Sequence, residues 1–293
     1  FKWKDIRKVD DSFSWFPKKR VGLGSLNVTI VGGTGGLGRA ITAVFAGAGA
    51  NVTVIGQTFR DSDKENVKFI KADLSSIASS QDVAKKLDVS KTDILLFTTG
   101  IFAAPIRQET KEGLERDISV SYLNRLAMIR ILAPKLGSEK NSLGFSPRIF
   151  IMAYPGSDQL GTPDDLNSEK KYGTMQAHMN TVAGNEALVY DSALKYKNLG
   201  IYGLNPGLVK TNIRDNLFGE NSWKSRIIES VIGWFTNTPE QYATKISPLL
   251  IAEELNSKTG GIFNNSGKAL FPSKGFTNEY ASQYIERSEE LLK

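Results

Sequence analysis

The sequence predicts a doubly wound α/β fold, a single domain in which a mainly parallel sheet of about seven strands carries helices on both faces. Three observations support this prediction. Short runs rich in β-branched residues alternate with longer segments of helical periodicity. Most of the short runs are apolar throughout, as strands buried on both faces are. No linker rich in proline, glycine or serine divides the 293 residues, so one large domain is the economical interpretation.

The elements follow in order along the chain. The first expected strand is a β-branched run that ends in glycines, and Gly49 closes the helical pattern after it. Gly56 ends the second strand, and Ser75 is the expected N-cap of the helix after the third. The expected strands span 27–31, 52–55, 67–70, 94–97, 149–152, 201–204 and 261–263. The expected helices span 37–48, 75–87, 114–136 and 175–197.

Two segments lie outside this alternation. Residues 1–26 are expected to form an N-terminal arm packed on the domain, which itself spans 27–293. Residues 212–238 form an insertion in which apolar residues recur at helical spacing between Trp223 and Phe235. This insertion is expected to pack on the core as an amphipathic helix, or to act as a lid over a substrate pocket, or to contact a membrane surface or a partner.

Composition excludes several classes of function. The chain has no cysteine and one histidine, His178, so disulfides, thiolate catalysis, zinc sites and iron–sulfur clusters are not expected, and no metal site is predicted. The net charge of +6 is mild, and no motif for binding nucleic acid is present. No run of eighteen apolar residues and no signal-peptide core occur, so we expect a cytoplasmic protein without a transmembrane segment.

A glycine-rich segment after the first strand carries the strongest local signal. It contains Gly32, Thr34, Gly36, Leu37 and Gly38 and opens the first helix. Glycines allow a tight turn and a close approach to a pyrophosphate, which the N–H groups of the helix N-terminus then bind. Because a strand precedes the motif and a helix follows it, the segment predicts a dinucleotide site of the Rossmann type rather than a merely structural turn.

The end of the second strand bears on the choice of dinucleotide. An acidic residue there would hold the ribose 2′-hydroxyl of NAD, whereas an arginine would accept the 2′-phosphate of NADP. The residue at this place is Gln57, whose amide can bond a hydroxyl, and Arg60 lies three residues further on. The sequence therefore favours NAD(H) and leaves NADP(H) open.

The motifs and their order resemble the short-chain dehydrogenase/reductase superfamily over about residues 27–270. The resemblance implies that Asp73 and Leu74 contact the adenine, that Thr99 and Gly100 lie at the cofactor, and that the segment from Pro206 to Thr211 cradles the nicotinamide amide. In the last segment the implied cofactor residues are Pro206, Gly207, Val209 and Thr211. The segments 113–117, 164–167 and 178–183 resemble more closely a small fungal group described as aldehyde reductases.

The catalytic pattern of that family is missing. Its members use a tyrosine as the proton donor, a lysine four residues later that lowers the tyrosine pKa and binds the ribose, a serine that orients the carbonyl, and an asparagine. Counting thirty residues back from the Pro-Gly pair places the tyrosine at Gln176 and the lysine at Asn180. The serine position falls on Tyr154 and the asparagine position on Ser121, so all four residues differ.

Several residues are candidates to replace the missing groups. Tyr154 and Tyr172 are the candidate proton donors, and Tyr172 would share one helix face with Gln176 and Asn180 if the helix extends back to it. Asn180 is the candidate for the nicotinamide ribose, and Ser121 completes the set. His178 would lie about 200° around the helix from Gln176, away from the site, as a structural or interface residue or else a proton relay.

These residues lead to one favoured function and two alternatives. An unperturbed tyrosine is protonated at pH 7, so loss of the lysine harms alcohol oxidation more than reduction of a reactive aldehyde. We therefore expect an NADH-dependent reductase of small aldehydes. The alternatives are a catalytically silent dinucleotide-binding sensor or scaffold, and a reductase of lipid-like carbonyls at a membrane surface. The family resemblance also implies a homo-oligomer that pairs through the two long helices.

Overall fold

One sheet of eight strands forms the centre of the molecule, for which the computed structural model describes residues 8–17, 22–61, 64–207 and 237–293. The strand order is β3-β2-β1-β4-β5-β6-β7-β8, and only β8 runs antiparallel to its neighbour. The bounds are β1 Asn27–Val31, β2 Asn51–Gly56, β3 Val67–Lys71, β4 Ile94–Phe97, β5 Arg148–Met152, β6 Gly200–Leu204, β7 Ile262–Phe263 and β8 Ala269–Leu270. The predicted fold class is confirmed, and the short β8 is the one strand that the sequence did not predict.

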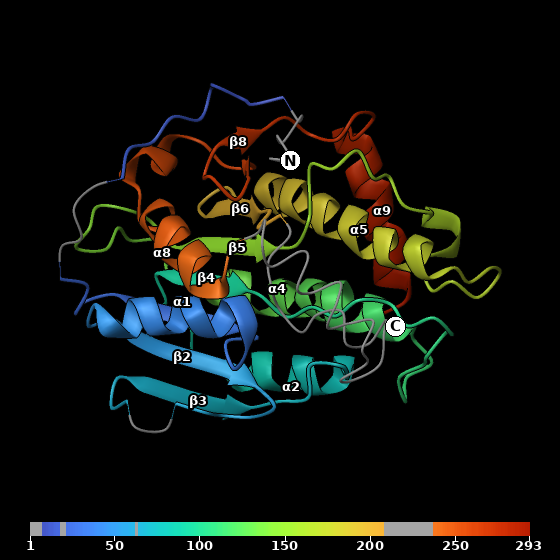
Figure 1. Ribbon diagram of the computed structural model, residues 1–293, viewed down its shortest axis with the longest axis horizontal. Helices are drawn as coiled ribbons and strands as arrows, with labels where there is room; N and C mark the ends of the chain where they lie inside the picture. The colour runs from blue at the N-terminus through green and yellow to red at the C-terminus, as the bar shows by residue number, and fades with distance from the viewer. Residues whose placement is uncertain (1–7, 18–21, 62–63, 208–236) are drawn as a thin grey trace.

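Helices cover both faces of the sheet (Figure 1). On one face, α1 (Gly36–Gly47) packs beside α8 (Pro239–Leu250), and both contribute to one apolar cluster. On the other face, α2 (Ile77–Lys86), α4 (Asn124–Leu132) and α5 (Thr174–Lys195) contribute to a second cluster. Strands enclosed by apolar layers on both sides are why the central runs of the sequence are apolar throughout.

The helix predicted over 114–136 is interrupted. It begins as a single turn, α3 (Arg116–Ile118), continues as a π-helical segment over Ser119–Leu123, and becomes regular only in α4. A short 3₁₀ turn at Ala133–Lys135 ends it. The prediction of one uninterrupted helix was wrong. A π-helical turn contains about one more residue than an α-helical turn, and this difference is too small to be visible in the spacing of the apolar residues.

Two helix starts also differ from the prediction. The N-cap of α2 is Ser76, whose hydroxyl accepts a hydrogen bond from the Ser79 N–H, whereas Ser75 donates to Asp73. Helix α5 begins at Thr174 after the N-cap Gly173, so Tyr172 precedes the helix and shares no helix face with Gln176 and Asn180.

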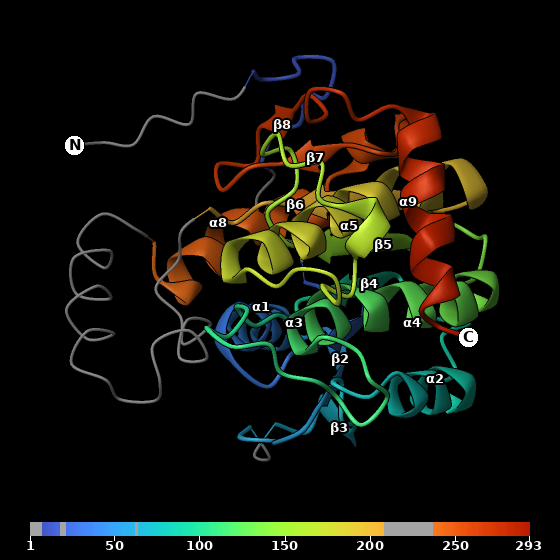
Figure 2. The same cartoon turned by 90° about the vertical axis from the view of Figure 1, so that its right-hand side faces the viewer.

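The last helix, α9 (Asn278–Glu290), lies across α5, and its C-terminal end is beside α4 (Figures 1 and 2). The hydroxyl of Tyr122 bonds that of Ser288 at 2.7 Å, and Arg130 of α4 bonds Glu289 at 2.7 Å. In consequence, most of α4 is enclosed within this chain.

Residues 8–17 of the predicted arm lie along the free edge of the sheet. Val9 forms an antiparallel bridge with Leu270 of β8, and the ring of Phe13 meets that of Phe263 edge to face. The predicted insertion at 212–238, including Trp223–Phe235, lies outside the described residues except for its last two positions. None of the helices in the described ranges has the length and apolarity needed to cross a bilayer.

Candidate active site

The glycine-rich turn between β1 and α1 forms one end of the site. Gly32 has a φ of +91°, and a Cβ there would lie 2.6 Å from the Thr99 amide nitrogen. A Cβ at Gly38 would lie 2.5 Å from the Gly32 carbonyl oxygen. At Gly35, by contrast, a Cβ would meet only open space, and within the described chain no side chain caps the start of α1. The turn therefore keeps its backbone N–H groups open to an anionic ligand, which fits a dinucleotide pyrophosphate.

A groove of about 410 Å³ extends from this turn across the ends of β1, β2 and β4. Eight of the predicted cofactor residues line it, namely Gly32, Thr34, Gly36, Leu37, Gln57, Leu74, Thr99 and Gly100. Asp73 does not line the groove but accepts a hydrogen bond of 2.9 Å from the Gln57 amide. Bonds from Ser75 keep the pKa of the Asp73 carboxyl below its usual value, so Asp73 is a charged acceptor that holds Gln57 in place.

Two arginines lie near the adenosine end of the groove. Arg60 donates to the Thr34 carbonyl oxygen at 2.9 Å, which brings its guanidinium to the glycine-rich turn. Arg39 is paired with Asp61 at 2.8 Å, so its charge is already compensated. Residue Arg60 is therefore closer to the dinucleotide groove than its distance of three positions from Gln57 suggests.

A second cavity of about 380 Å³ continues from this groove. The two share Leu37, Thr98, Gly100 and Ile101. Most side chains of the second cavity are apolar, and they include Phe102, Met152, Met175, Met179 and Val182. Pro206 and Gly207 close it from the end of β6, whereas Val209 and Thr211 lie outside the described residues. This arrangement, an apolar chamber next to a dinucleotide groove, suits a small organic substrate.

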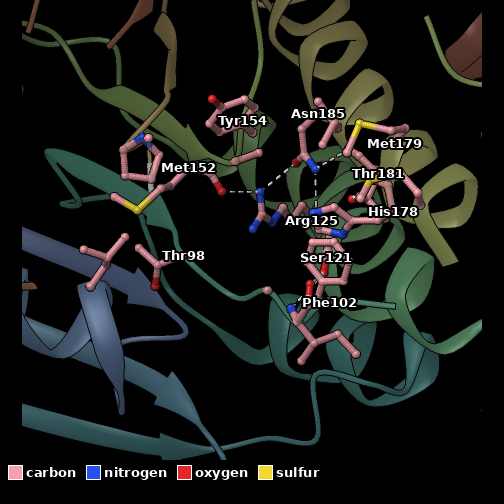
Figure 3. Close-up of a pocket in the computed structure, with 18 residues that line it drawn as sticks. Thr98, Phe102, Ser121, Arg125, Met152, Tyr154, His178, Met179, Thr181 and Asn185 are labelled. Atoms are coloured by element: carbon pink, nitrogen blue, oxygen red, sulfur yellow. Dashed lines mark hydrogen bonds between the residues drawn. The ribbon is translucent and has the colours of Figure 1, made fainter. Parts of the chain in front are cut away.

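The structure separates the four predicted catalytic residues. Tyr154 and Ser121 line the apolar cavity (Figure 3), and 37% of the Tyr154 surface is exposed. Tyr172 is not among the lining residues, and its hydroxyl donates to the Ala104 carbonyl oxygen. The side chain of Asn180 is fully buried on the other side of α5, where it bonds backbone atoms of Thr162, Asp165 and Leu166.

This placement corrects the expectation for Asn180 and for His178. Because Asn180 is engaged by the loop before α5, its face of the helix points away from the cavity and it does not reach a cofactor there. The residues of α5 that line the cavity include His178, Thr181, Val182 and Asn185. His178, expected to lie away from the site, is therefore inside it.

His178 belongs to a small polar network within the apolar cavity. Its Nδ1 lies 2.7 Å from Oδ2 of the fully buried Asp117, and its ring stacks on Phe102 with 3.9 Å between the centroids. The Ser121 hydroxyl donates to the other Asp117 oxygen at 2.5 Å and accepts from the Ile101 N–H at 3.0 Å. A carboxylate bonded to Nδ1 orients the ring and leaves Nε2 to exchange a proton with a ligand.

Arg125 occupies the centre of the cavity wall (Figure 3). One terminal nitrogen, Nη1, donates to the Met152 carbonyl oxygen and to Asn185 Oδ1, both at 2.7 Å. The other terminal nitrogen, Nη2, donates to the Thr99 carbonyl oxygen. Burial lowers the pKa of the guanidinium to about 9, and attraction to Asp117 opposes the shift, so the group remains a cation at neutral pH.

The comparisons with known proteins agree with this geometry. A family model for short-chain dehydrogenases matches residues 26–143. Over 291 residues the chain is 45% identical to an uncharacterized oxidoreductase of Saccharomyces cerevisiae, an alignment that covers 97% of this chain and 94% of the relative. The chain belongs to the short-chain dehydrogenase/reductase family.

Solved structures of the family share the fold. The ligand-free aldohexose dehydrogenase of Thermoplasma acidophilum superposes with a TM-score of 0.60 at 16% identity, covering 83% of this chain and 92% of that one. The protein BdcA, solved with NADPH, gives a TM-score of 0.59 at 19% identity, covering 88% of this chain and all of the other. These two structures show the shared fold, and the family to which the chain belongs is one of NAD(P)(H)-dependent oxidoreductases.

Sequence reasoning missed Asp117, Arg125 and Asn185. A signal for Arg125 was present, because it lies within a run of apolar residues in a helix and a buried arginine requires partners. No comparable signal marks Asp117, whose position depends on the interrupted helix before α4.

Proposed function

We propose that this protein is an NADH-dependent reductase of small aldehydes with apolar side chains. The observation that carries the proposal is that a dinucleotide groove opens into an apolar cavity whose wall holds His178 backed by the buried Asp117. The reaction consumes an aldehyde, NADH and a proton and yields a primary alcohol and NAD⁺. The glycine-rich turn and Gln57 would hold NADH, which would supply the hydride when bound.

The residues of the chain would supply the proton and the orientation. His178 would donate the proton to the carbonyl oxygen through Nε2, while its hydrogen bond to Asp117 holds the ring in position. Tyr154, which stands where the family carries its carbonyl-orienting serine, would hold the same oxygen or serve as a second donor. Tyr172 is outside the cavity and has no part in this proposal.

The choice of NADH over NADPH depends on Gln57, whose amide suits a ribose hydroxyl better than a phosphate. Arg60 is the group that would favour NADPH. Titration of the purified protein with each dinucleotide decides between them, since a lower Kd for NADH that persists in Arg60→Ala supports the first choice. A lower Kd for NADPH that is lost in that variant supports the second.

The test of the reaction is oxidation of NADH in the presence of a panel of small aldehydes. We expect His178→Gln to lower kcat/KM by about 100-fold, as loss of a general acid does. Asp117→Asn should lower it in the same direction, because the histidine then loses its charged partner. The matched control is Tyr172→Phe, which removes a hydroxyl outside the cavity and should leave kcat/KM within about twofold of the wild type.

Two outcomes would contradict the proposal in different ways. Full activity in His178→Gln would remove the histidine as the donor and leave Tyr154, which Tyr154→Phe then tests. Clear binding of NADH without turnover of any aldehyde would favour the silent sensor or scaffold, an alternative that the substitution of all four family residues supports.

A further inference from the structure

Arg125 is a buried cation that its protein partners satisfy only in part. A guanidinium carries five N–H groups. Three of them are used by the Met152 and Thr99 carbonyl oxygens and by Asn185. The Nε atom is buried and, within the described chain, has no hydrogen-bond partner. An unpaired buried donor is costly, and the Arg125 residue lines the apolar cavity, where a ligand would lie beside its guanidinium.

Among the described residues, Arg125 also has no hydrogen-bonded counterion. Its three partners are neutral oxygen atoms. The nearby carboxylate of Asp117 is bonded to Ser121 and His178 rather than to the guanidinium. A desolvated cation without a bonded counterion attracts any oxygen that carries negative charge in the same cavity.

The neighbouring residues hold the guanidinium in one orientation. The Asn185 amide donates to the carbonyl oxygens of Ser121 at 2.8 Å and Thr181 at 2.7 Å, so its oxygen must face Arg125. The Met152 and Thr99 carbonyls at the ends of β5 and β4 fix the other side. Arg125 is therefore anchored to two strands and to α5, although it belongs to α4. Its fixed position is what a preorganised electrostatic site requires.

We propose that Arg125 is the cation of the reaction site, and that its free N–H groups bind an oxygen of the ligand in the cavity. This inference rests on the proposed reductase function. In the family the cation is a lysine on the helix that here is α5, whereas this chain supplies it from α4 and uses Asn185 to position it. The bound oxygen is either a hydroxyl of the dinucleotide ribose or the carbonyl oxygen of the aldehyde, which gains negative charge as hydride arrives at its carbon.

The experiment compares Arg125→Lys and Arg125→Met with Arg148→Lys. Arg148 is the matched control, because it is equally buried and bonds the Leu250 and Ala252 carbonyl oxygens and Asn256, away from both cavities. Two quantities are measured for each protein. They are the Kd for NADH by equilibrium titration, which requires no turnover, and kcat with a saturating aldehyde. The melting temperature reports the structural effect of each substitution.

Two results would support the proposal and identify the oxygen. A Kd for NADH at least tenfold higher in Arg125→Met, with Arg148→Lys unchanged, assigns the ribose. An unchanged Kd with kcat about 100-fold lower assigns the aldehyde oxygen, as for other preorganised donors to a developing oxyanion. The lysine variant should show the smaller loss in either case, because it keeps the charge and loses the fork of donors.

The proposal is overturned if both Arg125 variants match Arg148→Lys in Kd and in kcat. If Arg125→Met does not fold, Arg125→Lys decides by the same comparison. Failure of the reductase function is a separate result, seen as the absence of turnover in the wild type. In that case the titration alone decides, and an NADH affinity that is insensitive to Arg125 overturns the proposal.

Discussion

Glu186 of α5 is a buried carboxyl group that ties two loops to the helix. Its oxygens accept hydrogen bonds from the Gly156 N–H and from the N–H and hydroxyl of Ser273, each at 2.7 Å. Burial raises the pKa of the Glu186 carboxyl, and these bonds only partly oppose the shift. Gly156 follows Tyr154 by two residues, so Glu186 also fixes the loop that presents Tyr154 to the cavity.

This raised pKa predicts how stability depends on pH. The unfolded chain releases the proton at the ordinary glutamate pKa, whereas the folded protein keeps it to higher pH. The contribution of Glu186 to the free energy of unfolding is therefore fully present at low pH and is lost as the pH rises through the folded-state pKa. Urea unfolding between pH 4 and pH 7, followed by tryptophan fluorescence, measures this decline.

Glu186→Gln should make the decline shallower. The variant should also be less stable by about 1–3 kcal/mol. The NH₂ group of the glutamine cannot accept a hydrogen bond, so one N–H that now donates to a Glu186 oxygen would lose its acceptor. The decline should not vanish, since the buried Glu115 also has a raised pKa and acts in the same direction. An identical pH profile in the wild type and the variant would contradict the assignment.

At the residue scale, the sequence identified the dinucleotide groove better than the reaction centre. Local backbone geometry constrains Gly32 and Gly38 by close contacts and Gly36 by a positive φ, and a motif records such constraints directly. The cavity residues of α5 depend instead on how the loop before the helix is packed, and Asn180 is turned toward that loop. Counting back from Pro206 placed the catalytic positions by the spacing typical of the family. That spacing contains no information about the contact between Asn180 and the loop.

Among the helices that the structure describes, α8 has the most complete N-terminal cap. The Thr238 hydroxyl accepts from the Gln241 N–H at 3.2 Å, and the Gln241 side chain accepts from the Thr238 N–H at 3.0 Å. Pro239 occupies the first turn, where its missing N–H leaves no hydrogen bond unmade.

Thr238→Ala should lower the free energy of unfolding by about 1 kcal/mol. The Gln241 N–H would lose its acceptor, and the reciprocal bond from the Thr238 N–H to the Gln241 side chain would be weakened. Thr277→Ala at the start of α9, where the hydroxyl caps one N–H at 3.1 Å, is the comparison. Chemical denaturation of both variants gives the two values, and a smaller loss at Thr238 than at Thr277 would argue against the cooperative cap.

The elements up to β7 were predicted well, whereas the helices α8 and α9 near the C-terminus were not predicted. All seven predicted strands and three of the four predicted helices lie within two residues of their predicted bounds, because each is a periodic segment bounded by glycine or polar residues. Strand β8 escaped prediction, since a pair of residues carries no periodicity. The interruption before α4 escaped it as well, because a π turn has no sequence signature of its own.

For the whole molecule, the position of α9 bears on assembly. The family resemblance implied pairing through the two long helices, here α4 and α5. In this chain α9 packs across α5, and the fully buried Tyr284 donates to the Asn180 carbonyl oxygen at 2.7 Å. Pairing through α4 and α5 would therefore require α9 to leave its place and expose an apolar surface to water.

We predict that the chain sediments as a monomer of 32.2 kDa at micromolar concentration. Analytical ultracentrifugation measures the mass directly. A substitution that loosens α9, such as Tyr284→Ala, should lower the free energy of unfolding by about 3–5 kcal/mol, the usual range for a large buried aromatic residue. A stable dimer in the wild type, with protection from hydrogen exchange added on another surface, would show that the homo-oligomer forms elsewhere.

The π-helical segment at Ser119–Leu123 makes the reaction centre depend on chain length as well as on residue identity. Asp117, Ser121 and Arg125 are four residues apart, and an unbroken α-helix would rotate the first and the last apart by about 80°. The wider π turn compensates for that rotation, so Ser121 and Arg125 line one cavity and Asp117 bonds Ser121 from behind its wall. Deleting one residue from this turn would therefore rotate the following residues of the helix, including Arg125, about the helix axis. Such a deletion is a way to misalign the site without replacing His178, Asp117 or Arg125.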